Sequence, residues 1–370
     1  MKGRKYMNLI SCVLTLSILL SSCLGGIQTQ NSYEDEKMNT VQVKNTVIGE
    51  GRPKICVPIV GKTKTDILEE AKKITTLPVD VVEWRVDWFD DVFATEKVLE
   101  TAKELQEVLK DIPVLLTFRT SKEGGEKEIS VNDYAALNIA AAQSGYVDLI
   151  DVEAFTGDEV VKTIINAAHE AGVKVIASNH DFFKTPEKEE IIRRLCMMQE
   201  FGADIPKIAV MPTCKQDVIT LLSATLEMSE KYADRPIITM SMAGTGVVSR
   251  LTGETFGSAL TFGAATKASA PGQINVNELA QVLDGPSAFA LSYEDATAPA
   301  RVIDEVMKDY KKMSFKAGVV EGVYYDAEGI EAIAAIPGRD QLIAKFMGSV
   351  QSPVSKLVRT FQAIADAKAE

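Results

Sequence analysis

Short apolar runs alternate along the chain with stretches whose apolar residues recur every three or four positions. The runs are rich in β-branched residues and predict strands, whereas the stretches between them predict helices and often end in Gly. The eight expected strands cover residues 54–60, 81–87, 113–120, 146–154, 173–181, 206–212, 236–244 and 259–265. Because strands and helices alternate at about 30-residue spacing and no glycine-rich dinucleotide turn follows the first strand, we expect an α/β fold, a (β/α)8 TIM barrel.

Charged and polar residues gather where the expected strands end. In a barrel of this kind the active site lies at the C-terminal ends of the strands. An apolar strand has no structural use for such residues unless they pair inside a pocket or bind a ligand. The residues concerned are Glu83, Arg85, Asp87, Arg119, Glu123, Asp151, Glu153, His180, Lys207, Arg250, Ser269 and Gln273. The alternative for the arginines is that they form surface salt bridges.

Lys207 and His180 are the two candidates for chemistry. Lys207 lies in the apolar segment "DIPKIAVMP", where desolvation favours a neutral amine that can form a Schiff base with a ketone. Alternatively, its side chain extends past the strand end to solvent. His180 ends the run "VKVIASNHD" and is either a core residue or a base. The other histidine, His169, falls near the end of a helix and is expected at the surface.

The pocket rim suits a small, hydroxylated carboxylate as substrate. An arginine guanidinium can clamp a carboxylate with two hydrogen bonds, while glutamate, serine and glutamine can bind hydroxyl groups. No His, Cys and carboxylate cluster has the spacing of a metal site, and there is no phosphate-binding glycine loop. We therefore expect neither a metal nor another cofactor.

Composition limits the possible partners and the number of domains. With 370 residues, 46 % of them hydrophobic, the chain can bury a barrel and a smaller unit. A net charge of −12 argues against a general nucleic-acid-binding surface. Five cysteines do not make a disulfide framework, and Cys56, Cys196 and Cys214 are expected to be small core residues.

The N-terminus has the layout of a secretory signal. Basic residues precede an apolar run that is too short for a lasting transmembrane helix, and "LSSC" resembles a bacterial lipobox. Residues 1–22 are then a lipoprotein-type signal peptide, Cys23 carries the lipid that anchors the chain to a membrane, and 23–37 form a flexible linker. The alternative is that translation starts at Met38.

Residues 38–283 resemble type I 3-dehydroquinate dehydratase, an enzyme of the shikimate pathway of aromatic amino acid biosynthesis. The matching motifs are "EWRVD", "LLTFRT" with "EGGE", "DVEAF", "SNHDF", "ADIPKIAVMP", "SRLTGETFGSALTFGA" and "KASAPGQI". The resemblance implies a carbon–oxygen lyase without a cofactor, which converts 3-dehydroquinate to 3-dehydroshikimate and water. It also favours a homodimer in the cytoplasm.

The resemblance assigns a role to each candidate residue. Lys207 condenses with the substrate ketone, and His180 removes the C2 proton and then helps the C1 hydroxyl leave as water. Glu123 orients His180, and the loop "KASAPGQI" closes over the bound ring. Arg250 clamps the substrate carboxylate. The implied substrate-binding residues are Glu83, Arg85, Arg119, Arg250, Ser269 and Gln273.

Residues 284–370 do not continue this pattern. They resemble the C-terminal half of the bacterial large-subunit ribosomal protein ten, the base of the ribosomal stalk, through "APARV", "EG", "PGRDQLIAKFMGS" and "KLVRTFQAIADAK". This resemblance implies a small α+β segment. The N-terminal part of that family, which supplies much of its rRNA-binding surface, is missing, which puts rRNA binding in doubt.

An apolar stripe runs along the last predicted helix at 354–365. Its members are Val354, Leu357, Val358, Phe361, Ile364 and Ala365. By the resemblance, this stripe binds acidic ribosomal stalk protein through helix packing. The alternative is that the stripe packs on its own small domain.

Three functional hypotheses follow. The chain is a dehydratase with a fused ribosomal stalk-base fragment, a multifunctional fusion whose C-terminal part binds acidic stalk protein, or a lipid-anchored, non-catalytic barrel. Biosynthetic function places the chain in the cytoplasm, whereas the lipobox at Cys23 predicts a membrane-anchored lipoprotein.

Overall fold

The computed structural model describes residues 39–265, 269–285, 287–292, 295–310 and 313–369. The expected signal peptide 1–22, the lipid-bearing Cys23 and the linker 23–37 lie outside the described residues. None of the helices in the described ranges combines the length and the hydrophobicity that a membrane-spanning segment requires.

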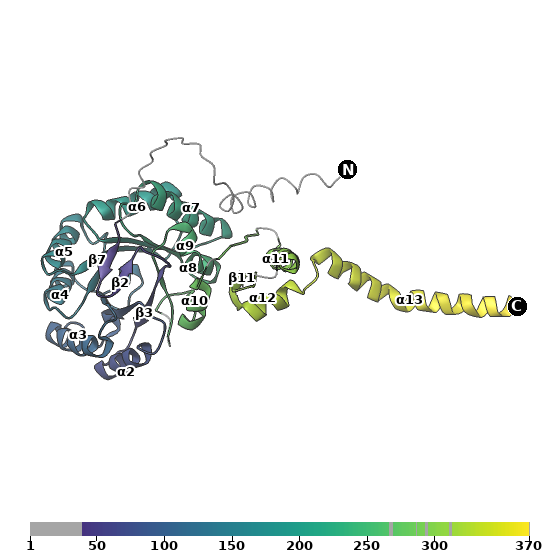
Figure 1. Ribbon diagram of the computed structural model, residues 1–370, viewed down its shortest axis with the longest axis horizontal. Coiled ribbons are helices and arrows are strands. Elements are labelled where there is room, and N and C mark those ends of the chain that lie inside the picture. The colour runs from purple at the N-terminus through teal and green to yellow at the C-terminus, as the bar shows by residue number, and fades with distance from the viewer. Residues whose placement is uncertain (1–38, 266–268, 286, 293–294, 311–312, 370) are drawn as a thin grey trace, which may run out of the picture. The chain divides into compact units, whose positions relative to one another are not determined.

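Eight parallel strands form a nearly closed barrel surrounded by helices, as expected (Figure 1). The strands are β3 (Lys54–Ile59), β4 (Val81–Arg85), β5 (Val114–Thr117), β6 (Leu149–Glu153), β7 (Lys174–Asp181), β8 (Ile205–Val210), β9 (Ile238–Ser241) and β10 (Leu260–Phe262). Their order in the sheet is β10-β3-β4-β5-β6-β7-β8-β9. An isolated parallel bridge between Ile237 and Ser258 joins the segments that lead into β9 and β10, which brings the ring close to closure.

Several barrel helices begin where the sequence supplies side chains that cap the helix N-terminus. They are α2 (Lys64–Ile74), α3 (Thr95–Leu109), α4 (Val131–Gln143), α5 (Asp158–Glu170), α6 (Lys188–Glu200), α7 (Lys215–Lys231), α8 (Val247–Leu251), α9 (Gly253–Phe256) and α10 (Val276–Leu283). Thr63 and Asp66 form a capping box at the start of α2, and the Ser130 side chain caps α4. The buried faces of these helices pack on the outside of the sheet.

A short hairpin precedes the barrel and was not expected from the sequence. Its strands, β1 (Val41–Val43) and β2 (Thr46–Ile48), pair antiparallel. Val41, Val43 and Ile48 are buried in the same cluster as residues at or near the N-terminal ends of the barrel strands, such as Val81 and Leu149. The hairpin thus fills the N-terminal end of the barrel, where packing serves stability, and the opposite end is left for the site.

The C-terminal segment is α+β and ends in a long helix. Its elements are α11 (Ala298–Asp309), β11 (Ala317–Val320), β12 (Val323–Asp326), α12 (Ala327–Ala334) and α13 (Arg339–Ala369). β11 and β12 form a two-stranded antiparallel sheet, and Ala300, Ile330 and Ile333 form a small core cluster.

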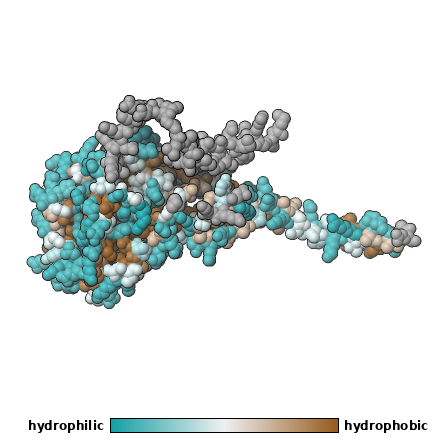
Figure 2. All heavy atoms as spheres, viewed as in Figure 1, coloured by the Kyte–Doolittle hydropathy of each residue, from teal (hydrophilic) through white to brown (hydrophobic). Residues whose placement is uncertain are grey.

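Helix α13 is exposed along its described length. Every described side chain from Arg339 to Lys368 is exposed, including the apolar stripe at 354–365. Phe361 is 62 % exposed, so the stripe does not pack on the described residues of its own segment. Hydrophobic and hydrophilic side chains alternate along this helix (Figure 2).

Candidate active site

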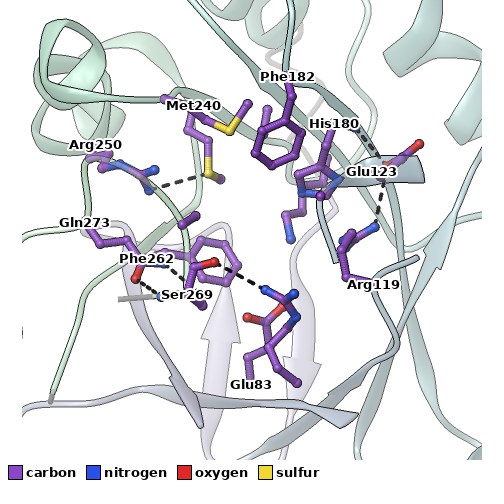
Figure 3. A pocket seen from close by; sticks show the side chains of 16 residues that line it. Glu83, Arg119, Glu123, His180, Phe182, Met240, Arg250, Phe262, Ser269 and Gln273 are labelled. Atoms are coloured by element: carbon purple, nitrogen blue, oxygen red, sulfur yellow. Dashed lines mark hydrogen bonds and ion pairs between the residues drawn. The ribbon is translucent and has the colours of Figure 1, made fainter. Parts of the chain in front are cut away.

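One pocket at the C-terminal ends of the strands brings all the predicted catalytic and substrate-binding residues together (Figure 3). These are Glu83, Arg85, Arg119, Glu123, His180, Lys207, Arg250, Ser269 and Gln273. The sequence did not single out the remaining wall, which consists of Gly124, Phe182, Ala209, Met240, Met242, Phe262 and Ala270. Ala209, Met240 and Phe262 lie on strands, where an apolar residue resembles a core residue in sequence, so only the closure of the barrel identifies them as lining.

Lys207 points into this pocket from β8. Its side chain is only 4 % exposed, which excludes the alternative of a lysine that extends to solvent. The Nζ atom lies 3.2 Å from Asp151 Oδ2 and 4.6 Å from the centre of the Phe262 ring. The lysine amine is thus buried between a carboxylate and an aromatic ring.

His180 and Glu123 form a hydrogen-bonded pair beside the lysine. His180 Nδ1 lies 3.0 Å from Glu123 Oε2, and the backbone N–H of His180 donates to the same oxygen at 2.9 Å. The Asn179 side chain donates to Glu123 Oε1 at 3.1 Å. With Glu123 ionised, Nδ1 donates its proton and Nε2 is left as the acceptor.

The pocket shifts the protonation of both partners. Burial, followed by the nearby charges of Arg119, Lys207 and Arg85, lowers the pKa of His180 well below its ordinary value. The histidine is therefore neutral at pH 7 and able to act as a base. Burial also raises the pKa of Glu123 to about 7, against the opposing effect of Arg119.

Glu123 reaches this position through a glycine turn after β5. Gly124 has a φ of 81°, and a Cβ atom there would lie 2.4 Å from the Phe182 ring. A Cβ atom on Gly125 would lie 1.8 Å from the Arg119 carbonyl oxygen. The two glycines of "EGGE" therefore allow the turn to pack against both neighbours.

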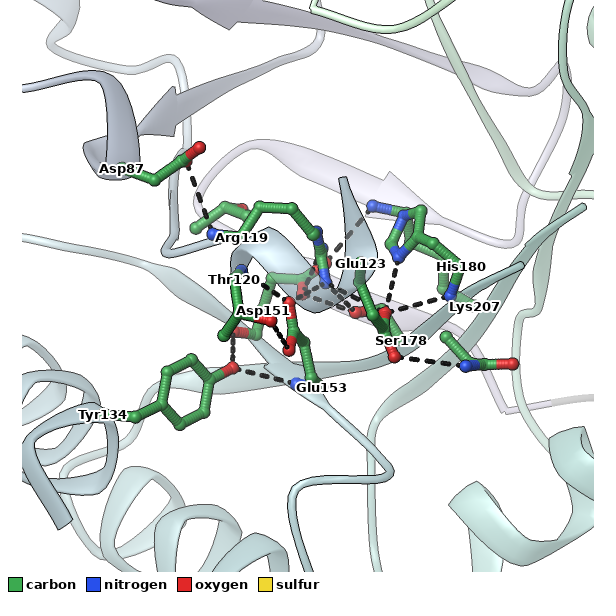
Figure 4. Close-up of polar contacts among 12 residues, drawn as sticks. Asp87, Arg119, Thr120, Glu123, Tyr134, Asp151, Glu153, Ser178, His180 and Lys207 are labelled. Atoms are coloured by element: carbon green, nitrogen blue, oxygen red, sulfur yellow. Dashed lines mark hydrogen bonds and ion pairs between the residues drawn. The ribbon is translucent and has the colours of Figure 1, made fainter. Parts of the chain in front are cut away.

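Arg119 lines the pocket and is surrounded by carboxylates (Figure 4). It lies 2.6 Å from Asp151, 3.1 Å from Glu153 and 3.5 Å from Glu123. Burial alone would lower the pKa of Arg119, but these carboxylates raise it well above its ordinary value. Its guanidinium thus holds three acidic side chains together, one of which is the partner of His180.

A second set of contacts fixes β6 beneath this cluster. The Tyr134 hydroxyl accepts a hydrogen bond from the Glu153 backbone N–H at 2.9 Å and donates to the Asp151 carbonyl at 3.4 Å. The Glu153 carboxylate accepts from both the backbone and the hydroxyl of Thr120 at 2.8 Å. Tyr134 lies on α4, so nothing in the strand pattern identified it.

Glu83 and Arg85 line the pocket from β4. Thr117 Oγ1 donates to Glu83 Oε1 at 2.9 Å. Arg85 donates to both oxygens of Asp87 at 2.8 Å, so the Asp87 carboxylate neutralises the charge of the Arg85 guanidinium. The Arg85 Nη1 atom also donates to the Ser269 carbonyl oxygen at 3.5 Å, which connects β4 to the loop after β10.

Arg250 has no such acidic partner. It is 2 % exposed, and among the described residues no carboxylate lies within ion-pair distance. Its Nη2 donates to the Pro271 carbonyl oxygen at 3.2 Å, and burial lowers its pKa to about 10. The guanidinium is therefore charged at neutral pH and available to an anionic ligand.

The loop after β10 carries Ser269 and Gln273. Gln273 Oε1 accepts from the Ser269 backbone N–H at 2.9 Å, and Gln273 Nε2 donates to Ser269 Oγ at 3.1 Å. Residues 266–268, which begin the expected closing loop, lie outside the described residues. The described part of the loop forms one side of the pocket.

The structure confirms the expected surface position of His169 but not the expected core position of every cysteine. His169, in the last turn of α5, is exposed and lies 2.8 Å from Asp204, away from the pocket. Cys56 is buried and Cys196 is half-buried, but Cys214 is exposed, so the expectation of a core residue was wrong there. Cys214 precedes α7 at the N-cap position, where the chain faces solvent. In the described part of the chain, no group of three His, Cys, Asp or Glu residues is arranged to hold a metal.

Comparisons with known proteins match two parts of the chain. The family model for type I 3-dehydroquinase matches residues 55–287, and that for the ribosomal protein uL10 C-terminal region matches 336–370. A 3-dehydroquinate dehydratase of Clostridioides difficile is 61 % identical over 244 residues, which cover 66 % of this chain and 96 % of that protein. One from Salmonella choleraesuis is 59 % identical over 246 residues, covering 66 % of this chain and 98 % of that protein.

Solved structures of 3-dehydroquinate dehydratases match about two thirds of the chain. The type I 3-dehydroquinate dehydratase of Clostridium difficile, solved with covalently modified comenic acid, has a TM-score of 0.65 at 60 % identity, covering 66 % of this chain and 97 % of that chain. The 3-dehydroquinate dehydratase of Enterococcus faecalis has a TM-score of 0.62 at 48 % identity, covering 66 % of this chain and 98 % of that chain.

Proposed function

The chain belongs to the type I 3-dehydroquinate dehydratase family of hydro-lyases, and on that premise we propose that its barrel converts 3-dehydroquinate to 3-dehydroshikimate through a Schiff base on Lys207. The proposal rests on the buried amine of Lys207, which shares a pocket with the neutral imidazole of His180. A similar structure was solved with covalently modified comenic acid, which supports covalent chemistry in this chain as well.

The first step forms the imine. The neutral amine of Lys207 adds to the ketone carbon, a proton is taken up, and the carbonyl oxygen leaves as water. The product is an iminium, in which nitrogen carries the positive charge. That charge makes the neighbouring C2 proton acidic, because the electrons it leaves behind are delocalised onto nitrogen.

The second step moves one proton twice. His180 Nε2 takes the C2 proton, which gives an enamine and an imidazolium. The enamine electrons then expel the C1 hydroxyl, and the imidazolium returns the proton so that the hydroxyl leaves as water. Hydrolysis of the new, conjugated iminium releases 3-dehydroshikimate and the lysine. Glu123 supports both transfers because it keeps Nδ1 as a donor.

Substrate recognition follows from the charges in the pocket. Arg250 is the proposed carboxylate clamp, since its charge is buried without an acidic partner. The hydroxyl groups and the ring are assigned to Glu83, Arg85, Arg119, Ser269 and Gln273. The charge of Arg119 is already shared among carboxylates, so its main contribution is to organise the catalytic groups.

Borohydride trapping tests the proposed reaction. With 3-dehydroquinate present, reduction should fix the ligand on the wild-type chain, and peptide mapping should find it on Lys207. Lys207→Ala should give no adduct, whereas Lys174→Ala, at a lysine whose side chain is 40 % exposed, should be trapped like the wild type. A folded wild-type chain that yields no adduct would contradict the proposal.

We propose a second function for α13, namely binding of acidic ribosomal stalk protein through the stripe at 354–365. The stripe is exposed, and the helix carries five basic but only two acidic side chains. A basic, amphipathic helix suits an acidic helical partner. The match to the uL10 C-terminal region over 336–370 supports this choice.

A pull-down with purified acidic stalk protein tests this binding. Phe361→Asp should abolish capture, because it puts a charge in the centre of the stripe. Ala363→Asp adds the same charge on the opposite face of the helix and should retain capture. Equal capture by both variants would count against the stripe as the binding surface.

A further inference from the structure

Asp151 contacts two residues that line the pocket, Arg119 and Lys207, yet the proposed mechanism does not use it. This β6 residue is fully buried. Its Oδ1 accepts hydrogen bonds from Arg119 Nη2 and Ser178 Oγ, both at 2.6 Å, and its Oδ2 lies 3.2 Å from Lys207 Nζ. Burial alone would raise the pKa of Asp151, but the charges of Arg119 and Lys207 hold it below its ordinary value. The side chain is therefore a carboxylate.

The two oxygens of this carboxylate have different partners. Oδ1 is fixed by Arg119 and Ser178, and the backbone of Asp151 is fixed by Tyr134. Oδ2 faces the lysine. Because Oδ1 and the backbone of Asp151 are fixed by hydrogen bonds, the carboxylate presents a stationary negative charge to Lys207 Nζ.

The other buried carboxylates in and near the pocket have partners of their own. Glu123 accepts hydrogen bonds from His180 and Asn179, and Glu153 accepts from Thr120 and Arg119. Glu83 accepts from Thr117. Among the described residues, Asp151 has the only carboxylate within ion-pair distance of Lys207 Nζ.

The charge on Nζ changes during the proposed reaction. The nitrogen is positive as an ammonium, neutral as the attacking amine, positive again as an iminium and neutral in the enamine. A fixed carboxylate 3.2 Å away stabilises the two positive forms relative to the neutral ones.

We propose that Asp151 is a positioning residue that serves as the fixed counter-ion of the Schiff-base nitrogen. It orients Nζ in the resting enzyme and stabilises the iminium once the ketone oxygen has left as water. This inference rests on the proposed Schiff-base function of Lys207. Its consequence is that Asp151 sets the pH range in which the imine forms.

The pH dependence of borohydride trapping with 3-dehydroquinate tests this role. In Asp151→Asn, a side chain of equal shape has no charge, so the midpoint of the trapping rate should move to lower pH by about one unit or more. Asp151→Ser should move it in the same direction, and Asp151→Glu should bring it back toward the wild-type value. Circular dichroism and thermal unfolding identify which variants are folded.

Ser178→Ala is the matched control. It removes a hydrogen bond from the same carboxylate but leaves the charge, so the midpoint should stay at the wild-type pH even if the rate falls. A midpoint that is unchanged in folded Asp151→Asn or Asp151→Ser, with Lys207 still trapped, would overturn the counter-ion role alone. Absence of an adduct in the wild type would instead overturn the Schiff-base function.

Discussion

At the residue scale, the pocket works through charges that are buried but unevenly paired. Arg85 and Arg119 are neutralised by carboxylates, whereas Arg250 is not. His180 is kept neutral while Glu123 is kept close to half-ionised near pH 7. Each side chain could be named from the sequence, but its protonation depends on which groups surround it in the fold.

Arg250→Lys should weaken substrate binding. A lysine keeps the charge but loses the two-pronged contact with a carboxylate, which is worth about 1.5–3 kcal/mol for a hydrogen bond to a charged group. We expect kcat/KM to fall about 10- to 100-fold, mainly through a higher KM measured in steady-state kinetics. Arg235→Lys, in a surface ion pair with Asp234, should leave KM unchanged. An unchanged KM in Arg250→Lys would argue that another residue holds the carboxylate.

Glu123 should make stability depend on pH. Its pKa is about 7 in the folded chain against 4.5 for an ordinary glutamate, so the folded state binds the proton more tightly. The resulting stabilisation is present below pH 4.5 and is lost as pH rises through 7, by about 3 kcal/mol at most.

Thermal unfolding of the wild type and Glu123→Gln from pH 4.5 to 8 measures this loss. Glutamine does not ionise, so the melting temperature of the wild type should fall relative to that of the variant as pH rises. Glu170→Gln, at an exposed end of α5, should show no such trend. A constant difference between wild type and Glu123→Gln would contradict the shifted pKa.

At the element scale, short turns after the strands decide where the functional groups point. The sequence placed all eight strands, but each strand in the structure is shorter than the expected one. β4, for example, ends at Arg85 and continues as a 3-10 turn over Val86–Trp88. The β1–β2 hairpin could not be predicted, because in three-residue strands the alternation of apolar and polar residues is too short to be recognised.

Gly124→Ala should damage both the turn and the catalytic pair. Alanine must adopt a positive φ, and its Cβ would collide with Phe182, which displaces Glu123 from His180. We expect kcat to fall at least 10-fold and stability to fall by about 1–3 kcal/mol. Gly145→Ala is the control, since its φ is also positive, at 72°, but nothing lies within 4 Å of the new methyl group. It should lose about 1 kcal/mol of stability and no activity, as measured by thermal unfolding and steady-state kinetics.

At the scale of the whole molecule, a barrel of the dehydratase family is followed by a segment with a different resemblance. The matches cover 55–287 and 336–370, so the segment between them is assigned to neither family. The exposed stripe of α13 needs no contact with the barrel to bind a partner. Both proposed functions can therefore operate in one chain.

We also predict, from the family resemblance, that the barrel forms a homodimer. Light scattering can measure this oligomeric state.

The N-terminus decides where these functions operate. If the lipobox is used, the intact mass of the native product should correspond to a chain that begins at acylated Cys23, and Cys23→Ala should lose the acyl group and the membrane association. A mass that begins at Met38 would instead show that translation starts there, and would place the enzyme in the cytoplasm with its pathway.

The sequence by itself determined the barrel and the identities of the candidate catalytic and substrate-binding residues, because strand periodicity and motif order are local properties of the chain. Only the tertiary structure decided their pairing. Lys207 meets Asp151, 56 residues earlier in the chain, because β6, β7 and β8 lie side by side in register. The burial that sets the protonation of His180 and Glu123, and the apolar wall opposite them, likewise exist only once the barrel has closed.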